Sequence, residues 1–105
     1  MGAEVLNLYE SIADASARML AAARRGDWDA LIEAEKECAR RVERLKAQRV
    51  DGPLGDEIDR RRRDIILTVL EHDAEIRELT QLWMARLEWL LNAAAAGRRV
   101  EQAYR

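Results

Sequence analysis

The chain has 105 residues, which is enough for one domain, and 49% of them are hydrophobic, mostly Ala and Leu, with no Phe. Ala, Leu, Glu and Arg favour helices, and one Pro and five Gly leave few breaks, so the composition predicts an all-α fold. A net charge of −2 excludes a general electrostatic attraction to nucleic acid or to acidic membranes.

The sequence also predicts a compartment. The single cysteine, Cys38, cannot form an intramolecular disulfide, which favours a reducing cytosol. The sequence shows no signal peptide, and no apolar run approaches the roughly 20 residues that a membrane span needs. We therefore predict a cytoplasmic protein that does not insert into membranes.

The first half of the chain is expected to form a helical hairpin. The first predicted helix covers residues 3–25 and ends at Gly26, which supplies the left-handed conformation common at helix ends. Asp27 then caps the second predicted helix, residues 28–48, with its side-chain oxygen. Two amphipathic runs joined by Gly-Asp predict that these helices pack antiparallel. Cys38 lies on the apolar stripe of the second helix and is interpreted as a packed thiol.

The third predicted helix starts near Pro53, which suits the first turn of a helix, and meets no obvious stop before Gly97. Residues 53–96 would span roughly 66 Å at 1.5 Å per residue, about twice the length of the second helix. Residues 98–105 form either a further short helical turn or a loose tail. The expected architecture is an antiparallel helical hairpin packed with a long third helix, a three-to-four-helix bundle with a short C-terminal helical tail.

An apolar stripe runs along the third predicted helix, and Ile76 on this stripe is expected in the core. The hairpin is shorter than the third helix, so the distal stripe needs another cover. A kink near Thr80 that folds the end back, a homodimer or a bound client would each supply one. The members of the stripe are Val69, Ile76, Trp83 and Leu90, which recur every seven residues, beside Ile66, Asp73, Thr80, Leu87 and Ala94.

A second apolar face is predicted on the same distal segment. Leu82 and Trp89 lie about 100–120° around the helix from the row that contains Trp83. With Leu79 they widen the apolar surface beyond what one partner helix covers, and Arg86 is a residue type common in binding hot spots. We interpret Leu79, Leu82, Arg86 and Trp89 as an interaction patch; the alternative is a helix end enclosed on all sides.

Residues suited to catalysis are sparse. Asp73 has His72 beside it and Arg77 one turn on, so an acid–base pair is conceivable, but an ion pair between Asp73 and Arg77, or a polar link across helices, is the simpler interpretation. One His and one Cys give no metal-ligand spacing, and the chain has no nucleophile elbow and no glycine loop that could bind phosphate. We therefore predict no enzyme and no catalytic, cofactor-binding or metal-binding residues.

The only basic cluster is the run from Arg60 to Arg63. It goes all the way round a helix and is flanked by acidic residues, which predicts a solvated, salt-bridged surface. Direct contact with nucleic acid through these arginines is the weaker alternative.

Three segments resemble a known family. Residues 20–29 (LAAARRGDWD), followed by Leu31, Glu35 and Cys38, resemble the helical hairpin of the FliT family. Residues 73–79 (DAEIREL), followed by Trp83 and Met84, resemble its third helix, and residues 102–105 (QAYR) resemble its C-terminal Ala-Tyr element. The family often has Pro immediately before the tryptophan of the third helix; Leu82 stands there in this chain, which favours a continuous helix.

The resemblance implies a flagellar type III export chaperone. Its expected client is the filament-cap protein FliD, held unassembled and delivered to the export apparatus, with the export ATPase and the export gate as further partners. In some lineages a family member also binds the flagellar master transcription regulator and represses flagellar genes. The resemblance therefore assigns the interaction patch to client binding. A structural, homo-oligomeric coiled-coil protein remains the alternative function.

Overall fold

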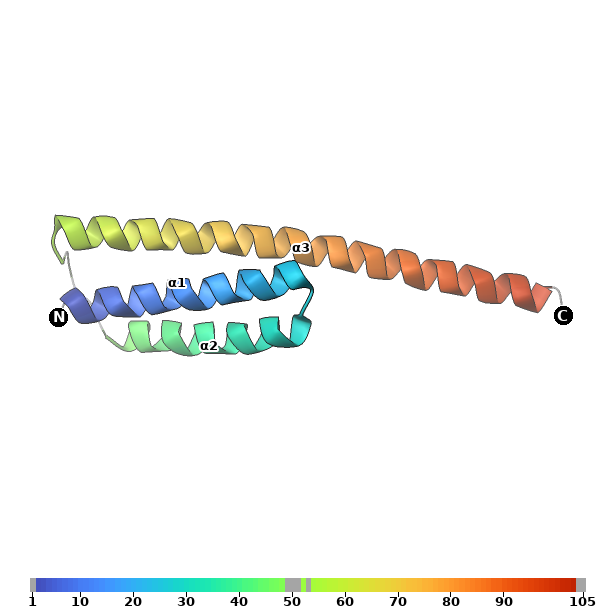
Figure 1. Cartoon of the computed structure of the whole chain (residues 1–105), viewed down its shortest axis with the longest axis horizontal. Helices are drawn as coiled ribbons and strands as arrows, with labels where there is room; N and C mark the ends of the chain where they lie inside the picture. Colours follow the sequence, from blue (N-terminus) through green and yellow to red (C-terminus); the bar gives the residue numbers. More distant parts are fainter. Residues whose placement is uncertain (1, 49–51, 53, 104–105) are drawn as a thin grey trace.

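The computed structural model describes residues 2–48, 52 and 54–103, and these form three helices without a strand: α1 (Gly2–Arg25), α2 (Trp28–Ala47) and α3 (Asp56–Ala103). The predicted all-α class is therefore confirmed. Figure 1 shows α1 lying between α2 and α3, with α1 and α3 running in the same direction. α1 packs against both neighbours, whereas the backbones of α2 and α3 do not approach each other closely.

The turn between α1 and α2 forms at the predicted residues. Gly26 has φ of 69°, and its N–H donates to the carbonyl of Ala23, while the N–H of Asp27 donates to that of Ala22. These two bonds are those of a Schellman motif, which satisfies carbonyls at the end of α1. The side chain of Asp27 accepts a hydrogen bond of 3.1 Å from the N–H of Ala30, the predicted cap of α2.

The core lies where α1 meets its two neighbours. Leu20, Ala23 and Ile76 form its densest cluster, and Met19, Leu31 and Leu79 pack against it. Ile76 is 8% exposed, as expected for a core residue, and no described residue of α2 is fully buried. Cys38 is half-buried, and burial raises the pKa of its thiol.

α3 is longer than predicted and continuous. It begins at Asp56, whereas the expected start at Pro53 lies outside the described residues. The helix passes without interruption through Thr80 and Leu82, so the end does not fold back by a kink. It also passes through Gly97, which has no positive φ, and ends at Ala103; the expected break near residue 96 is therefore absent. A glycine weakens a helix by only about 1 kcal/mol, which the surrounding alanines offset.

The distal part of α3 projects beyond the hairpin turn, as Figure 1 shows. The molecule measures 74 × 21 × 20 Å, and its radius of gyration is 20.6 Å. A compact chain of this length has a radius of gyration of about 13 Å. The three helices therefore form a short bundle with a long single-helix extension.

Polar contacts fix α1 against α3 along the bundle. Arg24 donates two hydrogen bonds, of 2.6 and 2.9 Å, to the carboxylate of Glu75 near the turn. The Ser16 hydroxyl of α1 also lies 3.0 Å from Nδ1 of His72 in α3. Within α3 itself, Asp73 pairs with Arg77 one turn further along the helix. His72 and Asp73 thus both have structural partners, as in the simpler of the two interpretations of this pair.

The contact between Arg24 and Glu75 makes stability depend on pH. The hydrogen bond from Arg24 holds the pKa of the Glu75 carboxyl below its ordinary value. Its contribution to stability is therefore complete above the unfolded-state pKa, about 4.3, and is lost as the pH falls through the lower folded-state value. We expect Glu75→Gln to lower the thermal midpoint slightly at pH 7 and not at all in strong acid. Thermal unfolding at both pH values, with Glu78→Gln as a control at an exposed site, measures this; equal losses in acid and at pH 7 would contradict it.

Candidate functional site

The contact between α2 and α3 at Trp83 marks the end of the bundle. The ring of Trp83 meets that of Trp28 edge-on, with centroids 5.8 Å apart and an interplanar angle of 89°. The same indole lies under the turn, where a Cβ added to Gly26 would come within 3.1 Å of it. Trp83 is nevertheless 39% exposed, because the hairpin covers only one side of it. Beyond this residue α3 has no neighbour among the described helices.

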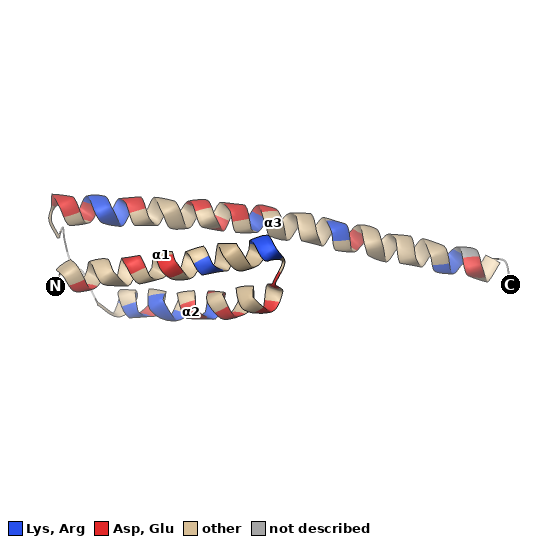
Figure 2. Ribbon diagram, in the orientation of Figure 1, with Lys and Arg blue, Asp and Glu red and all other residues tan. Residues whose placement is uncertain are grey.

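The projecting segment is apolar around most of its circumference. Between Trp83 and Arg98 its charged residues are Arg86 and Glu88, and Figure 2 shows most of the projecting segment without charged residues. A helix that is apolar all round is normally buried, and a large exposed apolar surface marks a site of interaction. The large exposed apolar residues of the segment are Leu82, Trp83, Met84, Leu87, Trp89, Leu90 and Leu91.

The four residues of the predicted interaction patch differ in how exposed they are. Leu82 and Trp89 are each 68% exposed, and Arg86 is exposed beside them. Leu79 is half-buried against the cluster of Leu20, Ala23 and Ile76, so this end of the patch lies next to the core. Because these positions are spaced by three or four residues in a continuous helix, they form one stripe that starts at the bundle and continues along the projection.

A second exposed stripe was not predicted as a surface. Ile66 and Leu70 of the bundle half of α3 are exposed, and Met84 and Leu91 of the projecting half lie on the same side of the helix. The alternating spacing of three and four residues that joins them is visible in the sequence. The sequence could not show that α1 would pack beside this stripe, on Ile65 and Ile76, and leave it open.

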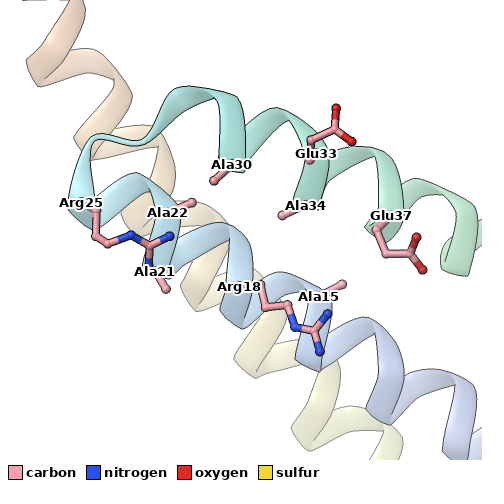
Figure 3. A pocket seen from close by; sticks show the side chains of 9 residues that line it. All are labelled: Ala15, Arg18, Ala21, Ala22, Arg25, Ala30, Glu33, Ala34 and Glu37. Carbon is pink, nitrogen blue, oxygen red and sulfur yellow. The ribbon is translucent and has the colours of Figure 1, made fainter.

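Shallow grooves lie between the helices. A groove of about 400 Å³ lies between α1 and α2, and Figure 3 shows alanines from both helices among the side chains that line it. Arg18 and Arg25 stand along the α1 side of this groove, and Glu33 and Glu37 along the α2 side. In the described part of the chain, no group of three His, Cys, Asp or Glu side chains could hold a metal ion.

Two of the four arginines in the cluster at the start of α3 form ion pairs. Arg61 pairs with Glu10 at 2.8 Å, and Arg62 pairs with Asp59 at 2.7 Å while lying over the ring of Tyr9. This is the salt-bridged surface predicted from the sequence. Over the same described residues, no helix combines the length and apolar character required to cross a membrane.

Comparison with known proteins identifies the family. A family model described as "Flagellar protein FliT" matches residues 6–105. The FliT flagellar proteins of Pectobacterium carotovorum and Pectobacterium atrosepticum are each 29% identical over 104 residues, covering 95% of this chain and 79% of theirs. The crystal structure of FliT from Bordetella bronchiseptica matches with a TM-score of 0.77 and 36% identity, over 82% of this chain and 97% of that chain. The family model covers all of α2 and α3 and α1 from residue 6 onward, and the chain therefore belongs to the FliT family of flagellar chaperones.

Proposed function

We propose that this chain is a cytoplasmic export chaperone that binds the filament-cap protein FliD before assembly and delivers it to the type III export apparatus. Membership of the FliT family supports the class of function. The observation that carries the proposal is the projecting half of α3, which presents large apolar side chains that the bundle does not cover.

In this proposal the client binds as an amphipathic helix. Leu82 and Trp89 lie on a different side of α3 from Trp83. Arg86 lies between Leu82 and Trp89 along the helix. A client helix that places its apolar side on Leu82 and Trp89 would bury both, while an acidic side chain at its edge would reach Arg86. Leu79 would continue the contact onto the bundle. Such binding holds the client unassembled and needs neither catalysis nor a cofactor.

The export ATPase and the export gate are partners in the same proposal, because a loaded chaperone must reach them to deliver its client. The flagellar master transcription regulator is a further proposed partner, through which the chain would repress flagellar genes. None of these contacts requires nucleic acid to touch the chain directly, in line with the paired state of Arg61 and Arg62.

The test of client binding is a titration of a C-terminal fragment of FliD into this protein by calorimetry. Trp89→Ala should weaken binding by about 1–3 kcal/mol, roughly 5- to 150-fold, because a large exposed aromatic side chain anchors the client. Helicity should change little, since Trp89 is 68% exposed and packs on nothing in the bundle.

A matched control is Leu67→Ala, which also removes an exposed apolar side chain from α3 but lies beside the hairpin. It should leave the affinity for FliD unchanged. Equal affinities of wild type and Trp89→Ala would place the client elsewhere, such as on the outer sides of α1 and α2. If neither the wild type nor any variant bound FliD, and the chain associated with itself, the result would favour the alternative of a structural coiled-coil protein.

A further inference from the structure

An apolar pocket of about 170 Å³ opens between α2 and α3, at the end of the bundle away from the hairpin turn. It exists because α1 packs against both helices while the backbones of α2 and α3 do not approach each other closely. An apolar cavity of about 150 Å³ is large enough to bind benzene, so this pocket can take one leucine or phenylalanine side chain. Its walls include Tyr9 and Ile12 of α1, Val42 and Leu45 of α2, and Ile66 and Leu70 of α3.

A basic groove continues from the apolar pocket toward the start of α3. The groove has a volume of about 520 Å³ and shares Tyr9 and Ile66 with the pocket. Arg60, Arg62 and Arg63 line it. Because Arg62 and Arg63 come four and three residues before Ile66, they lie on the same side of α3 as that residue. One surface therefore passes from apolar side chains to cationic ones.

The positive charge of the groove is only partly compensated. Asp59 lines the groove and pairs with Arg62 at 2.7 Å. Asp56 lines it as well, so three arginines stand beside two aspartates. Arg60 and Arg63 are exposed, and neither forms an ion pair with another residue that the structure describes. Their guanidinium groups can therefore donate hydrogen bonds to a partner's carboxylates.

A protein segment that combines a large apolar side chain with nearby carboxylates is complementary to this surface. The apolar side chain fills the pocket, and the carboxylates reach the guanidinium groups. Leu70 and Arg63 are seven residues apart, or about 10 Å along α3, a distance that an extended peptide covers in about three residues. Nucleic acid is a poorer fit, because its phosphates would lie against Asp56 and Asp59 as well as against the arginines.

We propose that the apolar pocket and the adjoining basic groove, together called the seam site, bind a short acidic and apolar segment of a partner protein. The seam site is separate from the proposed client surface, since Ile66 and Leu82 are 16 residues apart, or about 24 Å along α3. The chain can therefore hold this partner and its client at the same time.

Selection from a library of random peptides displayed on phage, with the full chain immobilised, tests the proposal. The enriched peptides should carry a leucine, methionine or phenylalanine with at least two carboxylates within about four positions of it. An enriched peptide, synthesised with a fluorescent label, then gives the dissociation constant by anisotropy. Binding should weaken as salt is added, because the arginines are exposed and salt screens their charge.

Variants of α3 locate the peptide. Arg63→Glu should raise the dissociation constant at least about tenfold, because it replaces an attraction by a repulsion. Leu70→Glu should have an effect of at least the same size, since it places a carboxylate at the apolar pocket. The matched controls are Arg99→Glu at the far end of α3 and Leu67→Glu, which is exposed and does not line the pocket. Both controls should bind the peptide as the wild type does.

Four results would overturn the proposal. They are the enrichment of no peptide, the enrichment of peptides without carboxylates, equal affinities of wild type, Arg63→Glu and Leu70→Glu, and tighter binding of a single-stranded oligonucleotide than of any selected peptide. If no peptide were selected and Leu70→Glu abolished a self-association of the chain, the seam site would belong to a second copy instead. The peptide should not change the affinity for the FliD fragment, so the seam site and the client surface can fail independently.

Discussion

Ile76→Ala is expected to lower the free energy of unfolding by about 2–5 kcal/mol. Ile76 is 8% exposed and lies in the cluster with Leu20 and Ala23, where α3 meets the end of α1. Truncation there removes buried methyl groups and leaves a cavity, because rigid helices on either side cannot close the space. Urea denaturation followed by circular dichroism measures the loss.

The control for this prediction is Leu82→Ala, six residues along the same helix. Leu82 is exposed, so its truncation should change stability by less than about 0.5 kcal/mol. A loss at Leu82 as large as that at Ile76 would mean that the projecting helix is enclosed, and would remove the basis for the interaction patch.

The second large effect is expected at the hairpin turn. Gly26→Val should lower stability by roughly 1–3 kcal/mol, because φ of 69° places a branched side chain in the left-handed region. The new Cβ would also lie 3.1 Å from the Trp83 indole, which would have to shift by a few tenths of an ångström where it meets Trp28. The loss should therefore appear together with a change in tryptophan fluorescence of the folded protein.

Gly97→Ala serves as the matched glycine control. Gly97 has helical backbone angles, and a Cβ added there meets nothing within 4 Å. The substitution should stabilise α3 by about 0.5–1 kcal/mol, since alanine loses less entropy than glycine in a helix. If Gly26→Val unfolded at the same denaturant concentration as wild type, the turn assigned to Gly26 would be wrong.

Local signals made the hairpin predictable. Gly26 and Asp27 act through their own backbone and side chain on the residues next to them, so their roles are visible without knowledge of the fold. The burial of Ile76 could also be predicted, because Ile76 belongs to the row of apolar residues, seven apart, that faces α1 along the length of the hairpin. Continuity through Leu82 followed from the absence of proline at that position.

Features that depend on where the hairpin stops could not be predicted. Leu79 and Leu82 are three residues apart and chemically alike, yet the first packs against the core and the second is exposed. The difference arises because α1 ends at Arg25, so the two leucines lie on either side of the boundary of the bundle. Leu90 is likewise exposed although it belongs to the same row as Ile76. The exposure of Ile66 and Leu70 depends on which side of α3 contacts α1.

The contact of Trp28 with Trp83 divides α3 into two parts with different sources of order. Before it, the helix is fixed by packing against the hairpin. After it, residues 84–103 rely on their own backbone hydrogen bonds and on intrinsic propensity, and isolated helices of this length are marginal in water. The distal turns of α3 therefore unfold locally more often than the bundle does, because segments with few tertiary contacts have the lowest free energy of opening. Whatever binds there also orders the helix, so affinity at this surface depends on intrinsic helix propensity as well as on the side chains in contact.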